Sequence, residues 1–216
     1  MTEYEDHFDR VRSILTELES IVNFSGSLLE GNCFYYHKTL VLCPILYHKQ
    51  VNLFWAGKQA STRICEIGFN AGHSAMLFLL SRDTAPVDFT IFDIGMHPYT
   101  RPALECMKVN FPDVKFEYIE GDSAKTMPDF IRSDPFNRIS RYDLVHVDGG
   151  HTEECIKNDM KNANLLVRKG GIIIIDDTND QTISNYVDLY ISTGNYEEIS
   201  ILKTDEYPHR MIRRIR

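Results

Sequence analysis

The residues best suited to chemistry are acids and a histidine that follow two apolar runs in the second half of the chain. Asp148 and, three residues later, His151 follow the first run, and Asp176 and Asp177 follow the second. If these runs are neighbouring parallel strands, their carboxyl ends bring three carboxylates together. Crowded carboxylates repel and favour a hard cation, and an oxygen-rich site without cysteine suits Mg²⁺ or Mn²⁺ better than zinc. We therefore expect Asp148, Asp176 and Asp177 to bind a divalent metal.

His151 is the candidate base beside these acids. If a hydroxyl group of a substrate binds the metal, the pKa of that hydroxyl is lowered. An imidazole that titrates near neutrality can then take its proton. The sequence thus predicts His151 and Asp148 as catalytic residues. The alternatives are that His151 caps a helix or ends a strand, and that Asp176 and Asp177 are a helix N-cap and a solvated acid.

A second group of residues follows an earlier apolar run. It is a glycine turn that contains Glu66, Gly68, Asn70 and Gly72 in the spacing E-x-G-x-x-x-G. This differs from the G-x-G-x-x-G turn that holds a pyrophosphate at a helix N-terminus. Glycines also permit close backbone approach to a ligand that has no phosphate, although they would equally serve an ordinary tight turn.

Three polar positions accompany this turn. Ser74 follows the second glycine, Asp93 ends the next apolar run, and Asp122 with Ser123 follows the run after that. Acids after strands often serve as helix N-caps, which is the alternative for Asp93 and Asp122. Their occurrence in order, each at the end of a strand, favours one extended ligand site.

Short apolar runs alternate with amphipathic segments over most of the chain. This pattern predicts an α/β fold, a Rossmann-like doubly wound sheet of seven strands whose last two strands form an antiparallel hairpin. We expect strands at 63–67, 89–93, 114–120, 142–148, 171–176, 197–203 and 210–215. Helices are expected at 3–22, 45–60, 74–81, 101–110, 123–133, 152–167 and 181–192, with Thr152 as an N-cap.

The organisation along the chain is an extension followed by one domain. Residues 1–44 are expected to form an N-terminal helix and a lid or loop outside the core, and residues 45–216 the catalytic domain. Aromatic residues at 34–55 would suit a wall over a substrate or packing within the extension. The extension would suit a homodimer contact as well as a lid.

Composition restricts the classes of partner and compartment. The chain has 216 residues, 43% hydrophobic and 25% charged, with a net charge of -8 that disfavours nucleic acid. The basic run at 210–216 is expected to be a solvated edge strand. Five cysteines without a CxxC pair indicate neither a disulfide framework nor a zinc site. The acidic N-terminus is unlike a signal peptide and no apolar run has transmembrane length, so we expect a cytoplasmic protein without membrane contact.

Taken together, the glycine turn and the acids after the second and third strands resemble class I S-adenosylmethionine (SAM)-dependent methyltransferases over about residues 45–216. The resemblance implies that Gly68, Asn70 and Gly72 wrap SAM. It places Glu66 near the amino-acid end of the cofactor and Ser74 as a donor to its carboxylate. It also implies that Asp93 accepts both ribose hydroxyls and that Asp122 and Ser123 contact the adenine.

Within this class, the second group of acids is similar to that of metal-dependent O-methyltransferases. Catechol-type enzymes carry an Asp after strand four and Asp-Asn after strand five, with a lysine as base. Macrolide sugar O-methyltransferases carry D-x-x-H and a double acid, which is closer to Asp148, His151, Asp176 and Asp177. The resemblance implies that these acids hold Mg²⁺ or Mn²⁺ and that His151 is the general base.

The function expected from the sequence is therefore SAM-dependent, divalent-metal-assisted O-methylation of a hydroxyl on a sugar or glycoconjugate. A catechol or phenolic O-methyltransferase is the close alternative, because a vicinal diol of either kind would chelate the metal. A metal-dependent hydroxylase on the same fold is less well matched, since one histidine with carboxylates differs from the two-histidine iron site. A non-catalytic binding protein is the remaining alternative.

Overall fold

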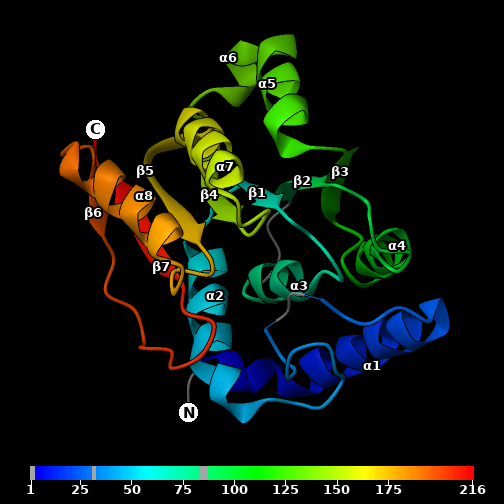
Figure 1. Ribbon diagram of the computed structural model, residues 1–216. Coiled ribbons are helices and arrows are strands. Elements are labelled where there is room, and N and C mark those ends of the chain that lie inside the picture. Colours follow the sequence, from blue (N-terminus) through cyan, green and yellow to red (C-terminus); the bar gives the residue numbers. More distant parts are fainter. Residues whose placement is uncertain (1–2, 31–32, 83–86) are drawn as a thin grey trace.

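The computed structural model describes residues 3–30, 33–82 and 87–216, and a seven-stranded sheet lies at its centre (Figure 1). The strand order is β3-β2-β1-β4-β5-β7-β6. The strands are β1 (Arg63–Ile67), β2 (Val87–Asp93), β3 (Val114–Glu120), β4 (Tyr142–Val147), β5 (Val167–Ile175), β6 (Tyr196–Glu198) and β7 (Arg210–Arg214). The first five are parallel, and β7 runs antiparallel to both β5 and β6. The predicted fold class and the antiparallel C-terminal pair are confirmed.

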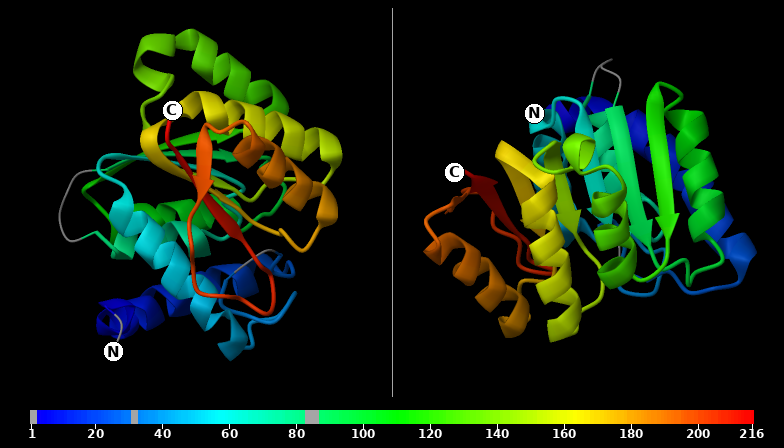
Figure 2. Two further views of the ribbon diagram at one scale, coloured as in Figure 1. Left: turned by 90° about the vertical axis from the view of Figure 1, so that its left-hand side faces the viewer. Right: turned by 90° about the horizontal axis from the view of Figure 1, so that it is seen from above.

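Helices cover both faces of this sheet, as the two views in Figure 2 show. One face carries α1 (Phe8–Ser25), α2 (Tyr47–Gln59), α3 (His73–Leu80) and α4 (Thr100–Asn110), and the other carries α5 (Ser123–Ser133), α7 (Glu153–Leu166) and α8 (Gln181–Ser192). Short turns of helix, η1 (Glu3–His7), η2 (Pro44–Leu46) and α6 (Pro135–Arg138), complete the chain. No helix in the described ranges has the length and apolar character needed to cross a membrane.

Strand β5 shows why the sequence pattern led to this architecture. Ile172 and Ile174 lie in the hydrophobic cluster on the α1–α4 side, while Ile173 and Ile175 lie in the cluster on the α5–α8 side. Successive side chains of a strand point to opposite faces, so an unbroken isoleucine run requires apolar cover on both. All four are at most 2% exposed.

The segment 23–44 corrects one expectation. It has no long helix or strand where it is described, as predicted, but it is not a lid outside the core. Leu29, Phe34 and Tyr35 are at most 3% exposed and belong to the hydrophobic cluster that includes α1 and α3. Tyr35 also donates a 2.7 Å hydrogen bond to Glu19 of α1. The aromatic residues of this segment are thus largely used in packing the extension onto the domain.

Two expectations for the C-terminal strands were also wrong. The predicted strand at 197–203 stops at Glu198, because the backbone of Leu202 turns away to α2, where the Asn52 side chain bonds both its N–H and its carbonyl oxygen. Strand β7 is not a solvated edge, since it lies between β5 and β6. Its Arg210 binds Glu198 and Asp188 rather than pointing freely into solvent.

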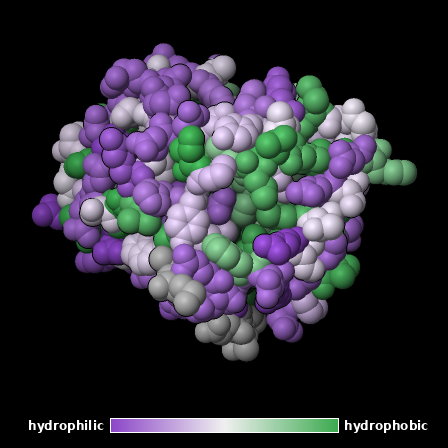
Figure 3. Space-filling model, turned by 90° about the horizontal axis from the view of Figure 1, so that it is seen from below, coloured by the Kyte–Doolittle hydropathy of each residue, from purple (hydrophilic) through white to green (hydrophobic). Residues whose placement is uncertain are grey.

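The side of the molecule that carries α1 has an apolar patch, seen in green in Figure 3. A groove of about 580 Å³ is lined there by α1 and by the chain between residues 34 and 50. Phe8 and Leu42, which line it, are 40% and 59% exposed. A homodimer contact at the extension stays a prediction.

Candidate active site

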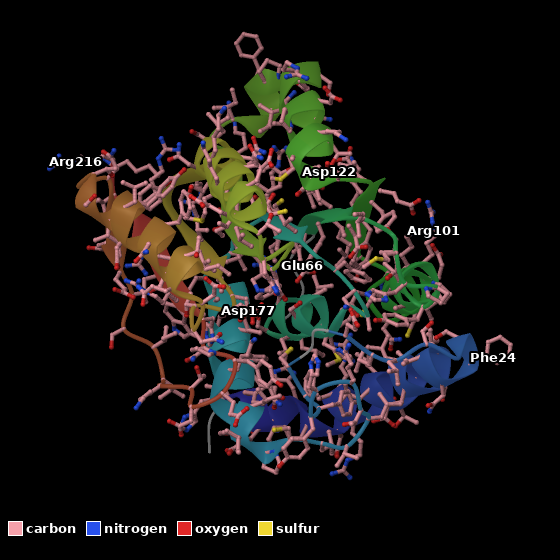
Figure 4. The ribbon with its side chains drawn as sticks, viewed as in Figure 1. Phe24, Glu66, Arg101, Asp122, Asp177 and Arg216 are labelled. Carbon is pink, nitrogen blue, oxygen red and sulfur yellow. The ribbon has the colours of Figure 1, made fainter. Side chains whose placement is uncertain are left out.

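A cavity of about 380 Å³ opens at the carboxyl ends of β1, β2, β4 and β5, which is the edge where ligands of open parallel sheets bind. Figure 4 shows Glu66 and Asp177 near the middle of the molecule and Asp122 at the start of α5. Most of the predicted site residues line this cavity: Gly68, Asn70, Ser74, Asp93, Asp122, Ser123, Asp148, His151, Asp176 and Asp177. Glu66 and Gly72 are not part of its lining. One cavity therefore joins the two groups of residues that the sequence analysis singled out.

The glycine turn between β1 and α3 is shaped by close backbone contact. Gly68 has φ +88°, and a Cβ atom there would lie 1.9 Å from the carbonyl oxygen of Asp148. Gly72 has φ +80°, and its Cβ would lie 2.7 Å from the Phe69 ring. Only glycine fits such positions without displacement. Gly68 thus lets the glycine turn touch the loop that carries Asp148.

Asp93 at the end of β2 holds the same turn from the other side. One carboxylate oxygen accepts hydrogen bonds from the N–H groups of Phe69 and Asn70, both at 2.9 Å, and the other accepts from the N–H of Gly95 at 2.7 Å. A carboxylate offers about four acceptor positions. Three are used by the backbone, so at most about one is left for a ribose hydroxyl.

Glu66 lies behind the turn in a fully buried position. One of its oxygens accepts hydrogen bonds from Ser74 Oγ and from His146 Nδ1, the latter at 2.9 Å. The other oxygen, Oε2, has no partner within the described chain. Glu66 therefore supports Ser74, which lines the cavity, instead of facing the ligand across the open space.

Asp122 and Ser123 begin α5 beside the cavity. Asp122 caps this helix by accepting from the N–H of Ala124, so the helix N-cap that the sequence left open is confirmed. Ser123 Oγ donates to Asp159 of α7 at 2.7 Å. Burial raises the pKa of Asp159 to about 6, although this hydrogen bond opposes the shift.

Asp176, the first acid after β5, is already paired with a cation of the chain, which the sequence did not predict. Lys49 of α2 places its Nζ atom 2.8 Å from Asp176 Oδ1 and 2.6 Å from Oδ2, with both side chains about 5% exposed. Burial opposes the charged forms, but the attraction between them prevails, which raises the pKa of Lys49 and lowers that of Asp176. Burial and the charge of Asp176 raise the pKa of Asp148.

His151 and Asp177 form a second pair nearer the surface. His151 Nε2 lies 2.7 Å from Asp177 Oδ2, with side chains 64% and 26% exposed. This hydrogen bond is the main reason that the pKa of His151 is raised above 6.5. Neither residue caps a helix, since Thr152 caps α7 as predicted and Asp180 caps α8.

The three predicted metal ligands, Asp148, Asp176 and Asp177, do not form one convergent group of ligand atoms in this structure. In the described residues the ligand atoms converge in two groups that share only Asp148: an inner one with His146 and Asp176, and an outer one with His151 and Asp177. The inner group contains the carboxylate that Lys49 binds with two contacts. The outer group would use the imidazole that was predicted as the base.

Sequence reasoning missed Lys49, His146 and His209. Lys49 shares one face of α2 with the buried Leu53 and Ala56, and a charge on an apolar helix face was the signal that could have identified it. His146 lies 4.0 Å from Asp176 as well as binding Glu66. His209 is buried, which lowers its pKa to about 4, and neither ring nitrogen has a hydrogen-bond partner in the described ranges.

Comparison with known proteins identifies the family of the chain. The sequence model of a family described as a methyltransferase domain matches residues 65–178, which run from β1 to the turn after β5. No curated protein matches the chain.

Three solved structures illustrate the likeness of fold. A putative O-methyltransferase from Klebsiella pneumoniae has a TM-score of 0.65 at 14% identity, over 94% of this chain and 90% of that one. The O-methyltransferase from Bacillus cereus in complex with SAH scores 0.63 at 15% identity, over 94% and 91%. CalS11, a TDP-rhamnose 3'-O-methyltransferase of calicheamicin biosynthesis, scores 0.60 at 16% identity, over 79% and 78%.

The family match covers more than half of the chain and includes the glycine turn, Asp93, Asp122, Asp148 and Asp176. The strand order and the antiparallel β7 agree with the folds of these O-methyltransferases. This chain belongs to the methyltransferase-domain family.

Proposed function

We propose that this protein transfers the methyl group of SAM to a hydroxyl oxygen of a sugar or glycoconjugate. The observation that carries the proposal is the single cavity that joins the glycine turn with His151 and the acids after β4 and β5. A methyl donor and an acceptor must meet within one enclosed space, because an in-line displacement needs both reacting atoms in contact.

The cofactor half of the cavity lies over β1, β2 and β3. Asn70, Ser74 and Asp93 offer polar groups on one side, and Asp122 with Ser123 offers them on the other. In the proposal the methionine part of SAM lies against the turn at Gly68, and the adenine lies toward Asp122. Asp93 contributes mainly by fixing the turn, with about one acceptor position for a ribose hydroxyl.

His151 is the proposed base. Donation of its Nε2–H to Asp177 fixes the tautomer in which the Nδ1 lone pair is free. The acceptor hydroxyl gives its proton to Nδ1 while its oxygen attacks the methyl carbon, and the electrons of the breaking carbon–sulfur bond stay on sulfur. S-adenosylhomocysteine leaves as a neutral thioether, so no acid is needed for the leaving group.

The acceptor class is argued from the open side of the cavity. His151 is largely exposed at the rim, so a bulky polar molecule can reach it without entering the core. CalS11, whose fold this chain shares, is a methyltransferase of TDP-rhamnose. A phenolic acceptor is the alternative. The aromatic Tyr35 and Trp55 could have formed a wall for a planar ring, but they are outside the cavity lining and pack in the core.

A metal-assisted form of the reaction is the second candidate. The outer group of Asp148, His151 and Asp177 favours it, because one ligand atom of each lies within 4.8 Å of the others. Mg²⁺ or Mn²⁺ at that group would lower the pKa of a bound hydroxyl. His151 would then be a ligand and another group would have to take the proton.

The test is a panel of sugars, nucleotide sugars and phenols incubated with methyl-labelled SAM, with His151→Ala beside the wild type. Loss of the base should cut turnover by about 10²–10⁴-fold while SAM affinity changes little. His37→Ala, at an exposed histidine outside the cavity lining, is the control. Methylation of phenols but not of sugars would reject the acceptor class, and full activity of His151→Ala would reject the base.

A further inference from the structure

The buried Lys49 is a charge that the proposed function has not used. It lies on α2, on the α1–α4 side of the sheet, and reaches the end of β5 across 127 positions of sequence. A buried ammonium is costly unless it is paired and hydrogen-bonded. A chain that only needed to fill this space could place an apolar side chain there, as it does at Leu53 one turn later.

The ammonium contacts Asp176, one of the three acids that were predicted to bind a divalent ion. Its two hydrogen bonds go to Asp176, one ligand atom of which lies within 4.8 Å of ligand atoms of Asp148 and His146. His146 reaches Asp176 from the other side, at 4.0 Å, and is itself fixed by Glu66 at 2.9 Å. Lys49 is therefore held by Asp176 at the end of β5, and Asp176 is linked through His146 and Glu66 to the network behind the glycine turn.

Lys49 also has a donor left for a ligand. An ammonium has three N–H groups, and the two oxygens of Asp176 use two of them. Since Lys49 lines the same cavity as His151 and Asp148, the third is available to an oxygen bound there.

We propose that Lys49 is the built-in cation of the acceptor site, a catalytic residue that takes the place of a divalent metal. This inference rests on the proposed function and assigns the contact with the acceptor oxygen. Lys49 donates one hydrogen bond to that oxygen and keeps its own proton throughout. As the hydroxyl proton passes to His151, the negative charge that develops on oxygen is stabilised by the fixed ammonium, and the oxygen then bonds to the methyl carbon of SAM.

The experiment compares wild type, Lys49→Met and Lys58→Met in methyl transfer with EDTA present. Lys58 is on the same helix but half-exposed and paired with Glu3, which makes it a matched control. The wild type and Lys58→Met should be insensitive to EDTA. Lys49→Met should lose about 10²–10³-fold in turnover, the usual effect of removing one donor to a developing oxyanion. Its affinity for S-adenosylhomocysteine should stay within about threefold of the wild type, because that ligand carries no acceptor oxygen.

A second readout is independent of activity. Mn²⁺ binding, followed by electron paramagnetic resonance, should be weak in the wild type and tighter by about 10-fold or more in Lys49→Met, where Asp176 is freed as a ligand beside Asp148. If Lys49→Met does not fold, Lys49→Arg keeps the charge and the bidentate contact, and it should keep EDTA-insensitive turnover and weak Mn²⁺ binding.

Three results would overturn the inference: loss of wild-type turnover in EDTA with recovery on adding Mn²⁺, unchanged turnover in Lys49→Met, or tight Mn²⁺ binding by the wild type. A wild type that methylates no hydroxyl compound would instead defeat the proposed function, and the Mn²⁺ comparison would still decide whether Lys49 excludes a metal.

Discussion

The contact between the glycine turn and the Asp148 loop leads to a quantitative prediction for Gly68→Ala. The new Cβ would lie 1.9 Å from a backbone oxygen, whereas real Cβ atoms keep more than 3.0 Å from such neighbours. One of the two loops would have to move by about 1 Å or more. The left-handed φ costs about 1–2 kcal/mol, and overpacking against rigid backbone adds about 1–3 kcal/mol. We expect the free energy of unfolding to fall by about 2–5 kcal/mol.

Gly26→Ala separates the two contributions. Gly26 follows α1 with φ +69°, in the same left-handed region as Gly68. Nothing, however, lies within 4 Å of a Cβ atom added at Gly26. This variant should lose only the conformational part, about 1–2 kcal/mol. Urea unfolding monitored by circular dichroism gives both values, and titration calorimetry with S-adenosylhomocysteine gives the affinity. We expect the affinity to fall at least about 10-fold in Gly68→Ala and to be unchanged in Gly26→Ala. Equal losses of stability in the two variants would refute the argument.

Three further variants test separate parts of the site. Asp177→Asn removes the main cause of the raised pKa of His151. The acidic limb of the pH–rate profile, where the base becomes protonated, should therefore move to lower pH. An unmoved limb would exclude His151 as the titrating base. Asp159→Asn should stabilise the protein by about 1–3 kcal/mol at pH 8 and not at pH 4. A carboxyl whose folded pKa is raised to about 6 contributes stability that is present below about pH 4 and lost as the pH rises through 6. Urea midpoints at the two pH values measure this difference, and a gain at both would contradict it. Asp93→Asn should lower the free energy of unfolding of the cofactor-free protein by about 1–3 kcal/mol, because its amide cannot accept all three backbone hydrogen bonds. A variant that lost only SAM affinity would show that Asp93 serves the ribose alone.

The features that the sequence predicted well depend on local patterns. Alternation of apolar runs and amphipathic segments is a property of neighbouring residues, so β3, α5 and α8 were placed at their observed bounds. Polar residues at strand ends were predicted to meet because parallel strands share one carboxyl edge, and the cavity lining contains most of them.

The features that could not be predicted depend on contacts between distant parts of the chain. Lys49 of α2 and Asp176 at the end of β5 are distant in sequence, and only the packing of α2 against the sheet brings them together. Asn52 likewise ends the predicted strand at 197–203 by binding the backbone of Leu202, 150 positions away. Strand propensity is weak when a side chain from elsewhere offers the backbone its hydrogen bonds. A pattern of acids therefore predicted where the charges converge, but not which cation neutralises them.

The most direct test of the account is methyl transfer from labelled SAM to a panel of hydroxyl-bearing sugars and nucleotide sugars, with EDTA present and the products identified by mass spectrometry and NMR. We predict that the label appears on a sugar oxygen, and that it is lost in His151→Ala while S-adenosylhomocysteine still binds. Binding of the cofactor with no transfer to any oxygen acceptor would contradict the proposed function of this cavity.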